Sequence, residues 1–252
     1  MTASANVNDR SLARTKGTSV QTYARIAAIL FLLTAIGGGL GEAYIPSKLI
    51  VSADAAATAR NITALDSLFR LGFATYLVEA TCDIALALVF YVLLRPVHRN
   101  LALLAAFFGL VSTSVFAVGE FFYFAPKLIL GGSSYLTTFS PGQLNTLALL
   151  SLKYYEYCGG LFMVFYGVAS IIRGYLIFRS GYLPRALGVL LVLGGVGFVA
   201  RNFALVLAPR YASDAFVLPM FVAGISLMLW LFVKGVDVAK WEVKTVSFRT
   251  TA

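Results

Sequence analysis

Two carboxylates lie inside a long apolar stretch of this sequence. Glu79 and Asp83 fall within the run RLGFATYLVEATCDIALALVFYVLLR, which extends from Arg70 to Arg95. An acidic side chain at the centre of a membrane-spanning helix adds roughly 2.5–3.5 kcal/mol to the free energy of insertion. The spacing of four residues places both carboxylates on one face of a helix. Carboxylates in that setting favour a cation, a proton or an amine, so this pair is the first candidate for a functional site.

Four more charged residues fall in the same half of the expected membrane thickness. Asp83 lies thirteen residues after Arg70 and twelve before Arg95, which places it near the middle of a bilayer at a rise of 1.5 Å per residue. The residues near the outer ends of other apolar segments are Glu42, Glu120, Glu156 and Arg201. We therefore predict a polar cavity that opens outward and narrows towards Asp83. Its candidate wall residues are Tyr76, Tyr123, Tyr154, Tyr157 and Asn202.

Each of these charges also has a purely structural interpretation. The three glutamates outside the second segment lie close enough to an interface to reach water. The central acidic pair can remain protonated and neutral, bonded to neighbouring helices. Arg201 can extend to the outer headgroups, or it can form an ion pair with Glu79, Glu120 or Glu156.

The composition places these residues in a membrane. Of the 252 residues, 60% are hydrophobic and 12% are charged, whereas soluble domains are about 45–50% apolar and about 25% charged. A chain of this size cannot hide so much apolar surface in one water-soluble core, so that surface must face lipid. No long polar segment separates the apolar ones, and we predict a single membrane domain.

Six apolar segments are long enough to cross a bilayer as helices. We predict an all-α, polytopic bundle of six transmembrane helices. The fourth segment is about twice as long as one crossing needs, so it extends beyond the membrane or bends at Gly159 and Gly160. The segments cover residues 25–45, 70–95, 101–124, 142–183, 186–208 and 214–233.

Local signals predict several helix boundaries. Pro46 is expected to end the first helix and Pro126 the third, because proline lacks the N–H donor of the helix interior. Ser52 is expected to cap a short surface helix between the first two spans. The sequence Ser-Pro-Gly-Gln at 140–143 has a capping residue, a proline and a glutamine in the order typical of a helix start.

Basic residues are divided unequally between the two sides of the membrane. With six spans both termini lie on one side, and thirteen of the twenty Lys and Arg residues fall in the termini and two tight turns of that side, with Arg173 and Arg179 in the second of these turns. The positive-inside rule then predicts cytoplasmic termini in a cytoplasmic membrane. The expected organisation is a disordered cytoplasmic tail (1–22), a six-helix membrane domain (23–236) and a cytoplasmic tail (237–252).

Metal, cofactor and nucleic-acid chemistry have little support in the sequence. The net charge of +9 is spread over termini and short turns, so we expect the lipid bilayer as partner and no nucleic acid. Cys82, Cys158 and the single His98 show no spacing typical of a metal site. Because no HExxH, GxSxG or paired Asp-rich motif occurs, we expect no catalytic residues, and an enzyme for a lipid or isoprenoid substrate is the weakest hypothesis.

Two functional hypotheses carry more weight. The first is a carrier or binding protein for a small cation, a proton or an amine, with Glu79 and Asp83 at its centre. The second is a non-catalytic accessory or sensor protein that packs against a partner protein or a second copy. Small loops and glycine-rich helix faces favour such packing.

Several blocks of the sequence together resemble a bacterial family of integral membrane proteins, the domain of unknown function 4386. The most specific blocks are CDIALALVFYVLLRPV and GYLIFRSGYLPRALG, and others such as RIAAILFLLTAIGGG and FSPGQL extend the resemblance over most of residues 25–236. The resemblance implies six helices and a cytoplasmic membrane. It implies no activity and no catalytic residues.

Overall fold

The chain folds into helices, as its hydrophobic segments predict. The structure is a computed structural model that describes residues 19–251, with side chains described as far as residue 247. This part of the chain contains no strand. Its elements in chain order are α2 (Val20–Gly38), the π-helix η1 (Gly39–Tyr44), α3 (Ile45–Leu49), α4 (Ala55–Ala64), α5 (Asp66–Leu94), α6 (Arg99–Ile129), η2 (Ser134–Leu136), α7 (Pro141–Ser180), α8 (Arg185–Leu207), η3 (Pro209–Tyr211), η4 (Asp214–Val217), α9 (Leu218–Val233) and α10 (Val238–Thr251).

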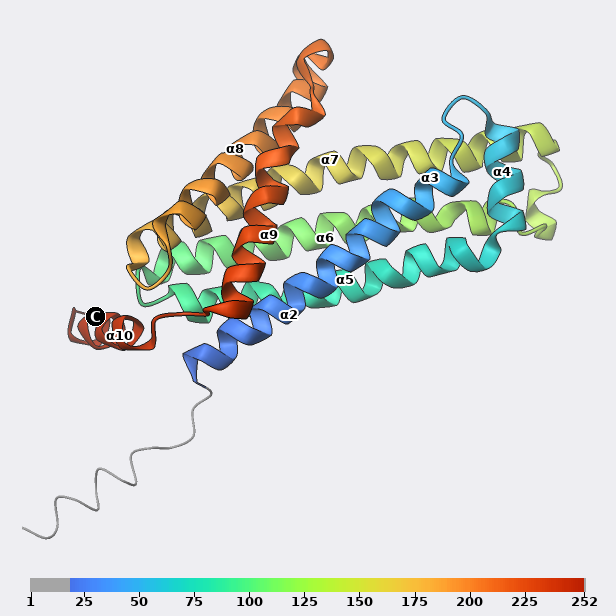
Figure 1. Cartoon of the computed structure of the whole chain (residues 1–252). Coiled ribbons are helices and arrows are strands. Elements are labelled where there is room, and N and C mark those ends of the chain that lie inside the picture. The colour runs from blue at the N-terminus through green and yellow to red at the C-terminus, as the bar shows by residue number, and fades with distance from the viewer. Residues whose placement is uncertain (1–18, 252) are drawn as a thin grey trace, which may run out of the picture.

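The predicted number of spans is confirmed. Between residues 19 and 251, six helical segments are long and apolar enough to cross a membrane, the first of them running from α2 through η1 and α3. Successive spans contact one another, and α9 returns to contact α2, so the six form a closed ring. Figure 1 shows α5, α6 and α7 running alongside one another, with the hairpin of α8 and α9 leaning away from them.

The two ends of the ring differ. One end is closed by α4 and is called here the α4 end; at the other, called the terminal end, α2 begins and α10 lies outside the bundle (Figure 1). The side of the membrane that each end faces stays a prediction from the distribution of basic residues.

The first span continues through Pro46, so the prediction that this proline ends it is wrong. A π-helix precedes the proline, and the N–H of Ile45 bonds to the carbonyl of Leu40, five residues back. The wider turn moves carbonyl groups away from the proline ring, which would clash with them in a regular α-helix. Helix α3 then extends to Leu49. Pro126 likewise lies inside α6, which ends at Ile129, because packed neighbouring helices tolerate the missing donor.

The short helix α4 begins at a different residue from the one predicted. Asp54 is its cap, and its Oδ1 accepts a hydrogen bond from the N–H of Ala57 at 2.8 Å. Ser52 lies two residues outside the cap, so the prediction of a Ser52 cap is wrong. Thr58 and Ile62 are buried, and α4 therefore packs on the ends of α5, α6 and α7.

Helix α7 is a single helix of 40 residues. It begins with the predicted capping box, in which Ser140 and Gln143 each bond the other's backbone N–H. At 1.5 Å per residue it is about 60 Å long, about twice the hydrocarbon thickness. No break occurs at Gly159 or Gly160, and the extension of α7 beyond the membrane stays a prediction.

Glycines bring α7 and α8 into backbone contact. A Cβ atom added to Gly195 would lie 2.5 Å from the carbonyl oxygen of Gly167, and one added to Gly188 would lie 2.6 Å from the carbonyl oxygen of Gly174. No other residue fits at these positions. The glycine-rich face of α8 is therefore used within the chain, in the manner of small-residue contacts between membrane helices.

Hydrogen bonds fix α2 to α9 at the terminal end. Arg25 donates to the carbonyls of Leu231 and Val233, both at 3.2 Å. Gln21 donates to the carbonyl of Lys234 at 3.1 Å and accepts from the N–H of Val236 at 3.0 Å. A guanidinium at the C-terminus of a helix satisfies carbonyls that have no partner within the helix. These contacts close the ring at its terminal end.

Two separate apolar cores occupy the two ends of the ring. The one at the α4 end contains Ile45, Leu49, Ile62, Phe69, Tyr123 and Leu152. The larger one includes Leu93, Leu176, Ile177, Leu227 and Leu231 of the terminal half. The candidate carboxylates lie on the stretches of helix between these cores.

Candidate functional site

Four of the six predicted site residues come together inside the ring. Glu42 lies on η1, Glu79 and Asp83 on α5, and Glu120 on α6. Glu79 interacts electrostatically with each of the other three carboxylates, and Glu42 interacts with Asp83 and Glu120 as well. Helices that are distant in sequence thus bring four acidic groups into one electrostatic cluster, called here the acidic cluster.

Small residues on the first span make room for Glu79. A Cβ atom on Gly38 would lie 3.4 Å from Oε1 of Glu79, and one on Gly37 would lie 3.6 Å from Oε2. The π-helix begins at the next residue and carries Glu42. Single π-helical turns inside α-helices are frequent at functional sites because they redirect side chains. The two glycines therefore allow the carboxylate of Glu79 to pack against the first span, and the π-helix carries Glu42.

The acidic cluster opens into a cavity of about 520 Å³. Five spans line it, and Glu42, Glu79 and Asp83 supply its acidic wall. Glu42 remains accessible from the surface, whereas Glu79 and Asp83 are partly buried. Glu120 is only 3% exposed and lies behind this wall, close to Tyr155. This volume is within the range of sites for small ligands.

Arg173 forms the cationic floor below Asp83. The two residues attract one another electrostatically and together line a void of about 10 Å³, too small for a solute. The guanidinium is buried, and its carbon atom lies 5.4 Å from the ring centre of Phe90 and 5.9 Å from that of Tyr166. Such cation–π contacts stabilise a desolvated guanidinium. In the described chain, no ion pair within 4 Å includes Asp83.

The sequence placed Arg173 in a basic turn, and that assignment is wrong. Helix α7 continues seven residues beyond it, to Ser180, so Arg173 lies about 10 Å inside the helix at 1.5 Å per residue. The signal was present, since neither a glycine pair nor a proline occurs between Arg173 and Gly181.

Two predicted site residues lie outside the acidic cluster. Glu156 points away from the ring, with its side chain 69% exposed, and forms an ion pair with Lys153 at 2.9 Å. Arg201 pairs with Asp214 at 2.9 Å and also donates to Asn202. The predicted alternative of an ion pair between Arg201 and one of three glutamates is therefore wrong. Its carboxylate partner is Asp214, at the start of η4.

The predicted wall tyrosines separate into two groups. Tyr154 and Tyr157 are 53% and 62% exposed and face outward from α7, so their assignment to the cavity wall is wrong. Tyr123 is buried and donates to the carbonyl of Phe69. Tyr76 is also buried, next to the acidic cluster, and its hydroxyl has no hydrogen-bond partner in the described chain. Asn202 is buried and bonds to the carbonyl of Phe198.

The charge balance of the interior is negative. The acidic cluster has four carboxylates, and the buried guanidinium of Arg173 interacts with one of them, that of Asp83. In the part of the chain that the structure describes, no group of three His, Cys, Asp or Glu side chains has the arrangement to hold a metal ion. Protons or a bound cation can compensate the remaining carboxylates, because unpaired charges inside a membrane protein are costly.

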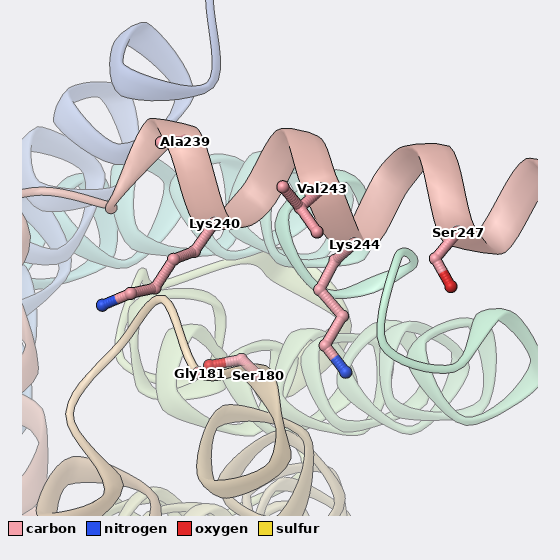
Figure 2. Close-up of a pocket in the computed structure, with 7 residues that line it drawn as sticks. All are labelled: Ser180, Gly181, Ala239, Lys240, Val243, Lys244 and Ser247. Atoms are coloured by element: carbon pink, nitrogen blue, oxygen red, sulfur yellow. The ribbon is translucent and has the colours of Figure 1, made fainter.

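A second cavity lies at the terminal end, between α10 and the turn after α7. It too has a volume of about 520 Å³ and contains none of the six candidate residues. Figure 2 shows Lys240 and Lys244 extending from α10 on the side of Ser180 and Gly181. Lys240 forms an ion pair with Asp237 at 2.9 Å. This basic, open groove differs in charge from the acidic cavity inside the ring.

Comparison with known proteins identifies the family of this chain. Over 155 residues the chain is 26% identical to an uncharacterised protein of Archaeoglobus fulgidus, a match that covers 61% of this chain and 76% of that protein. No solved structure matches the chain. The family model described as domain of unknown function, DUF4386, matches residues 26–235, which include all six spans except the start of the first. The chain therefore belongs to the DUF4386 family.

Proposed function

We propose that this protein binds a cation in the acidic cavity and carries it across the membrane. The observation that supports the proposal is the excess of interior carboxylates, of which Glu42, Glu79 and Asp83 line a cavity large enough for a small solute. A cation that enters this cavity meets carboxylates that have no ion pair among the described residues. The cation class includes inorganic cations, protons and amines.

The position of Arg173 supports alternation between two states. Asp83 lies between the cavity above and Arg173 below. A cation in the cavity competes with the guanidinium for the same carboxylate, so binding weakens the attraction that holds the floor closed. A carrier needs such a differential interaction between its states.

The alternative role, an accessory or sensor protein, has less support. It relied on glycine-rich faces as surfaces for a partner. Gly188 and Gly195 of α8 pack against Gly174 and Gly167 of α7 instead. Gly37 and Gly38 of the first span likewise face Glu79.

Transport in proteoliposomes tests the proposal. The protein is reconstituted, and uptake of radiolabelled methylammonium and sodium, together with proton flux reported by an enclosed pH dye, is measured with and without Glu79→Gln. We expect at least one flux in the unmodified protein and at least about a tenfold loss in the variant, because removal of a buried charged partner typically weakens binding by 2–5 kcal/mol. Glu156→Gln is the matched control, since Glu156 is exposed and paired with Lys153. Flux that is absent from the unmodified protein, or unchanged by Glu79→Gln, would contradict the proposal.

A further inference from the structure

The walls of the acidic cavity are apolar away from its carboxylates. Aromatic, aliphatic and methionine side chains from α2, α7, α8 and α9 cover most of it, and they include Phe31, Met163, Leu191, Phe198, Met220 and Met228. Methionine side chains adapt to ligands of irregular shape. A small hydrated ion gains nothing from such walls, whereas an apolar group loses contact with water there.

The cavity is continuous with the surface that faces lipid. Phe221 and Ile225 line it from α9 and are also 61% and 54% exposed. Arg25 ties α2 to the last turn of α9 at the terminal end. From this clamp the hairpin of α8 and α9 leans away from the bundle (Figure 1). The opening between α2 and α9 therefore lies on the side of the α4 end.

Two glycines keep this opening wide. Gly39 on the first span and Gly224 on α9 both line the cavity. A Cβ atom added to either would meet no other atom within 4 Å. These glycines are therefore not needed for close packing between helices, unlike those of α8. Side chains at these two positions would fill the entrance.

The polar end of the cavity is suited to a cationic head. Glu42, Glu79 and Asp83 lie there, and the buried hydroxyl of Tyr76, beside Glu79 and Asp83, has no hydrogen-bond partner in the described chain. The cavity thus has a negative part, which extends from the accessible Glu42 to the partly buried Asp83, and an apolar part open to lipid. These match the two parts of an amphipathic cation.

We infer that the cavity takes an amphipathic organic cation, an ammonium group carrying an alkyl or aryl chain, which enters from the bilayer between α2 and α9. This inference rests on the proposed function and names its substrate class. The ammonium group lies among the three carboxylates, and the chain lies between Phe31 and the methionines. Each methylene that leaves water for such a wall is expected to raise the affinity about fourfold, from the transfer free energy of a CH₂ group.

Binding of alkyltrimethylammonium ions tests the inference. The full chain is placed in lipid nanodiscs, and tetramethyl-, butyltrimethyl- and hexyltrimethylammonium are titrated by calorimetry, with empty nanodiscs as the blank for partition into lipid. We expect affinity to rise about fourfold per methylene. Glu79→Gln should lower the affinity for all three ions by at least tenfold. Gly224→Phe should lower the affinity for hexyltrimethylammonium by at least tenfold and change the affinity for tetramethylammonium by less than twofold.

Two further variants complete the test. Gly159→Phe is the matched control, because Gly159 is also a helical glycine whose added Cβ would meet nothing within 4 Å, and it does not line the cavity. If Gly224→Phe does not fold, Met228→Ala replaces it and should weaken hexyltrimethylammonium alone. Equal affinity for the three ions, with loss in Glu79→Gln, would overturn the inference and leave the proposed function standing. Absence of binding by any ion, together with absence of flux, would overturn both.

Discussion

Asp83 of α5 and Arg173 of α7 face each other across the floor of the acidic cavity, 90 residues apart in sequence. Asp83 lines both the cavity and the void beneath it, whereas Arg173 lines only the void. The carboxylate is therefore shared between the candidate ligand site and an internal cation. Coupling between these two residues is the first quantity to measure.

Removal of Arg173 should destabilise the protein, because Arg173 is the buried counter-charge of Asp83. Arg173→Gln leaves Asp83 without its buried counter-charge, and loss of one partner of a buried pair typically lowers the free energy of unfolding by about 3–5 kcal/mol. Thermal unfolding in mild detergent checks this. Adding Asp83→Asn to the variant should restore part of the loss, with a coupling free energy of about 0.5–3 kcal/mol. Additive effects would show that the two residues do not interact. Arg179→Gln is the control, because Arg179 is exposed on the last turn of α7.

The contact between α7 and α8 should be intolerant of a single methyl group. Gly195→Ala places a Cβ atom 2.5 Å from the carbonyl oxygen of Gly167, and overpacking of this kind typically costs about 1–3 kcal/mol. A lower unfolding temperature is expected. Gly159→Ala, in the same pair of helices but in open space, should not lower it. Equal behaviour of the two variants would argue against close packing at Gly195.

The clamp between α2 and α9 should hold the terminal end of the ring closed. Arg25→Gln removes the hydrogen bonds of the guanidinium to Leu231 and Val233, and hydrogen bonds to charged groups contribute about 1.5–3 kcal/mol each. Hydrogen–deuterium exchange of the peptide at the end of α9 should become faster. Exchange at the start of α8 should not change. Arg60→Gln is the control, because Arg60 is exposed on α4; a similar increase in that variant would contradict the clamp.

Acid should release the start of α10. Hydrogen bonds from Lys240, first its side chain and then its backbone N–H, lower the pKa of Asp237 below the usual 3.8. A carboxyl whose pKa is lower in the folded state stabilises that state above the unfolded pKa, and the contribution disappears as pH falls through the folded pKa. The attachment of α10 should therefore be constant above about pH 5 and weaken below about pH 4.

Fluorescence of Trp241 reports this change. Its Nε1 donates to the carbonyl of Leu93 at 3.1 Å, and Trp230→Phe removes the other tryptophan signal. In that background the emission should shift below about pH 4 towards the emission of Asp237→Ala. The Asp237→Ala variant itself should show no such transition. An identical acid transition in both proteins would assign it to another group.

The sequence alone determined the fold class of this protein. Apolar segments of the length of a bilayer can cross it only as helices, since every backbone polar group must bond within its own segment. Six spans followed from that constraint. The start of α7 was predictable for a different reason, because capping is local chemistry between Ser140 and Gln143. The positions of Glu79 and Asp83 near the middle of the second span also followed from counting residues.

Only the tertiary structure decided which charges meet. Glu42 and Glu120 join the central pair because helices remote in sequence turn them into the same space, and hydropathy does not record the rotation of a helix about its axis. The same rotation points Glu156 outward, and the fold of the turn after α8 supplies Asp214 to Arg201. Arg173 was missed because a helix end cannot be located from charge alone. The lateral opening between α2 and α9 depends on how the hairpin of α8 and α9 leans, which is a property of packing and not of any one segment.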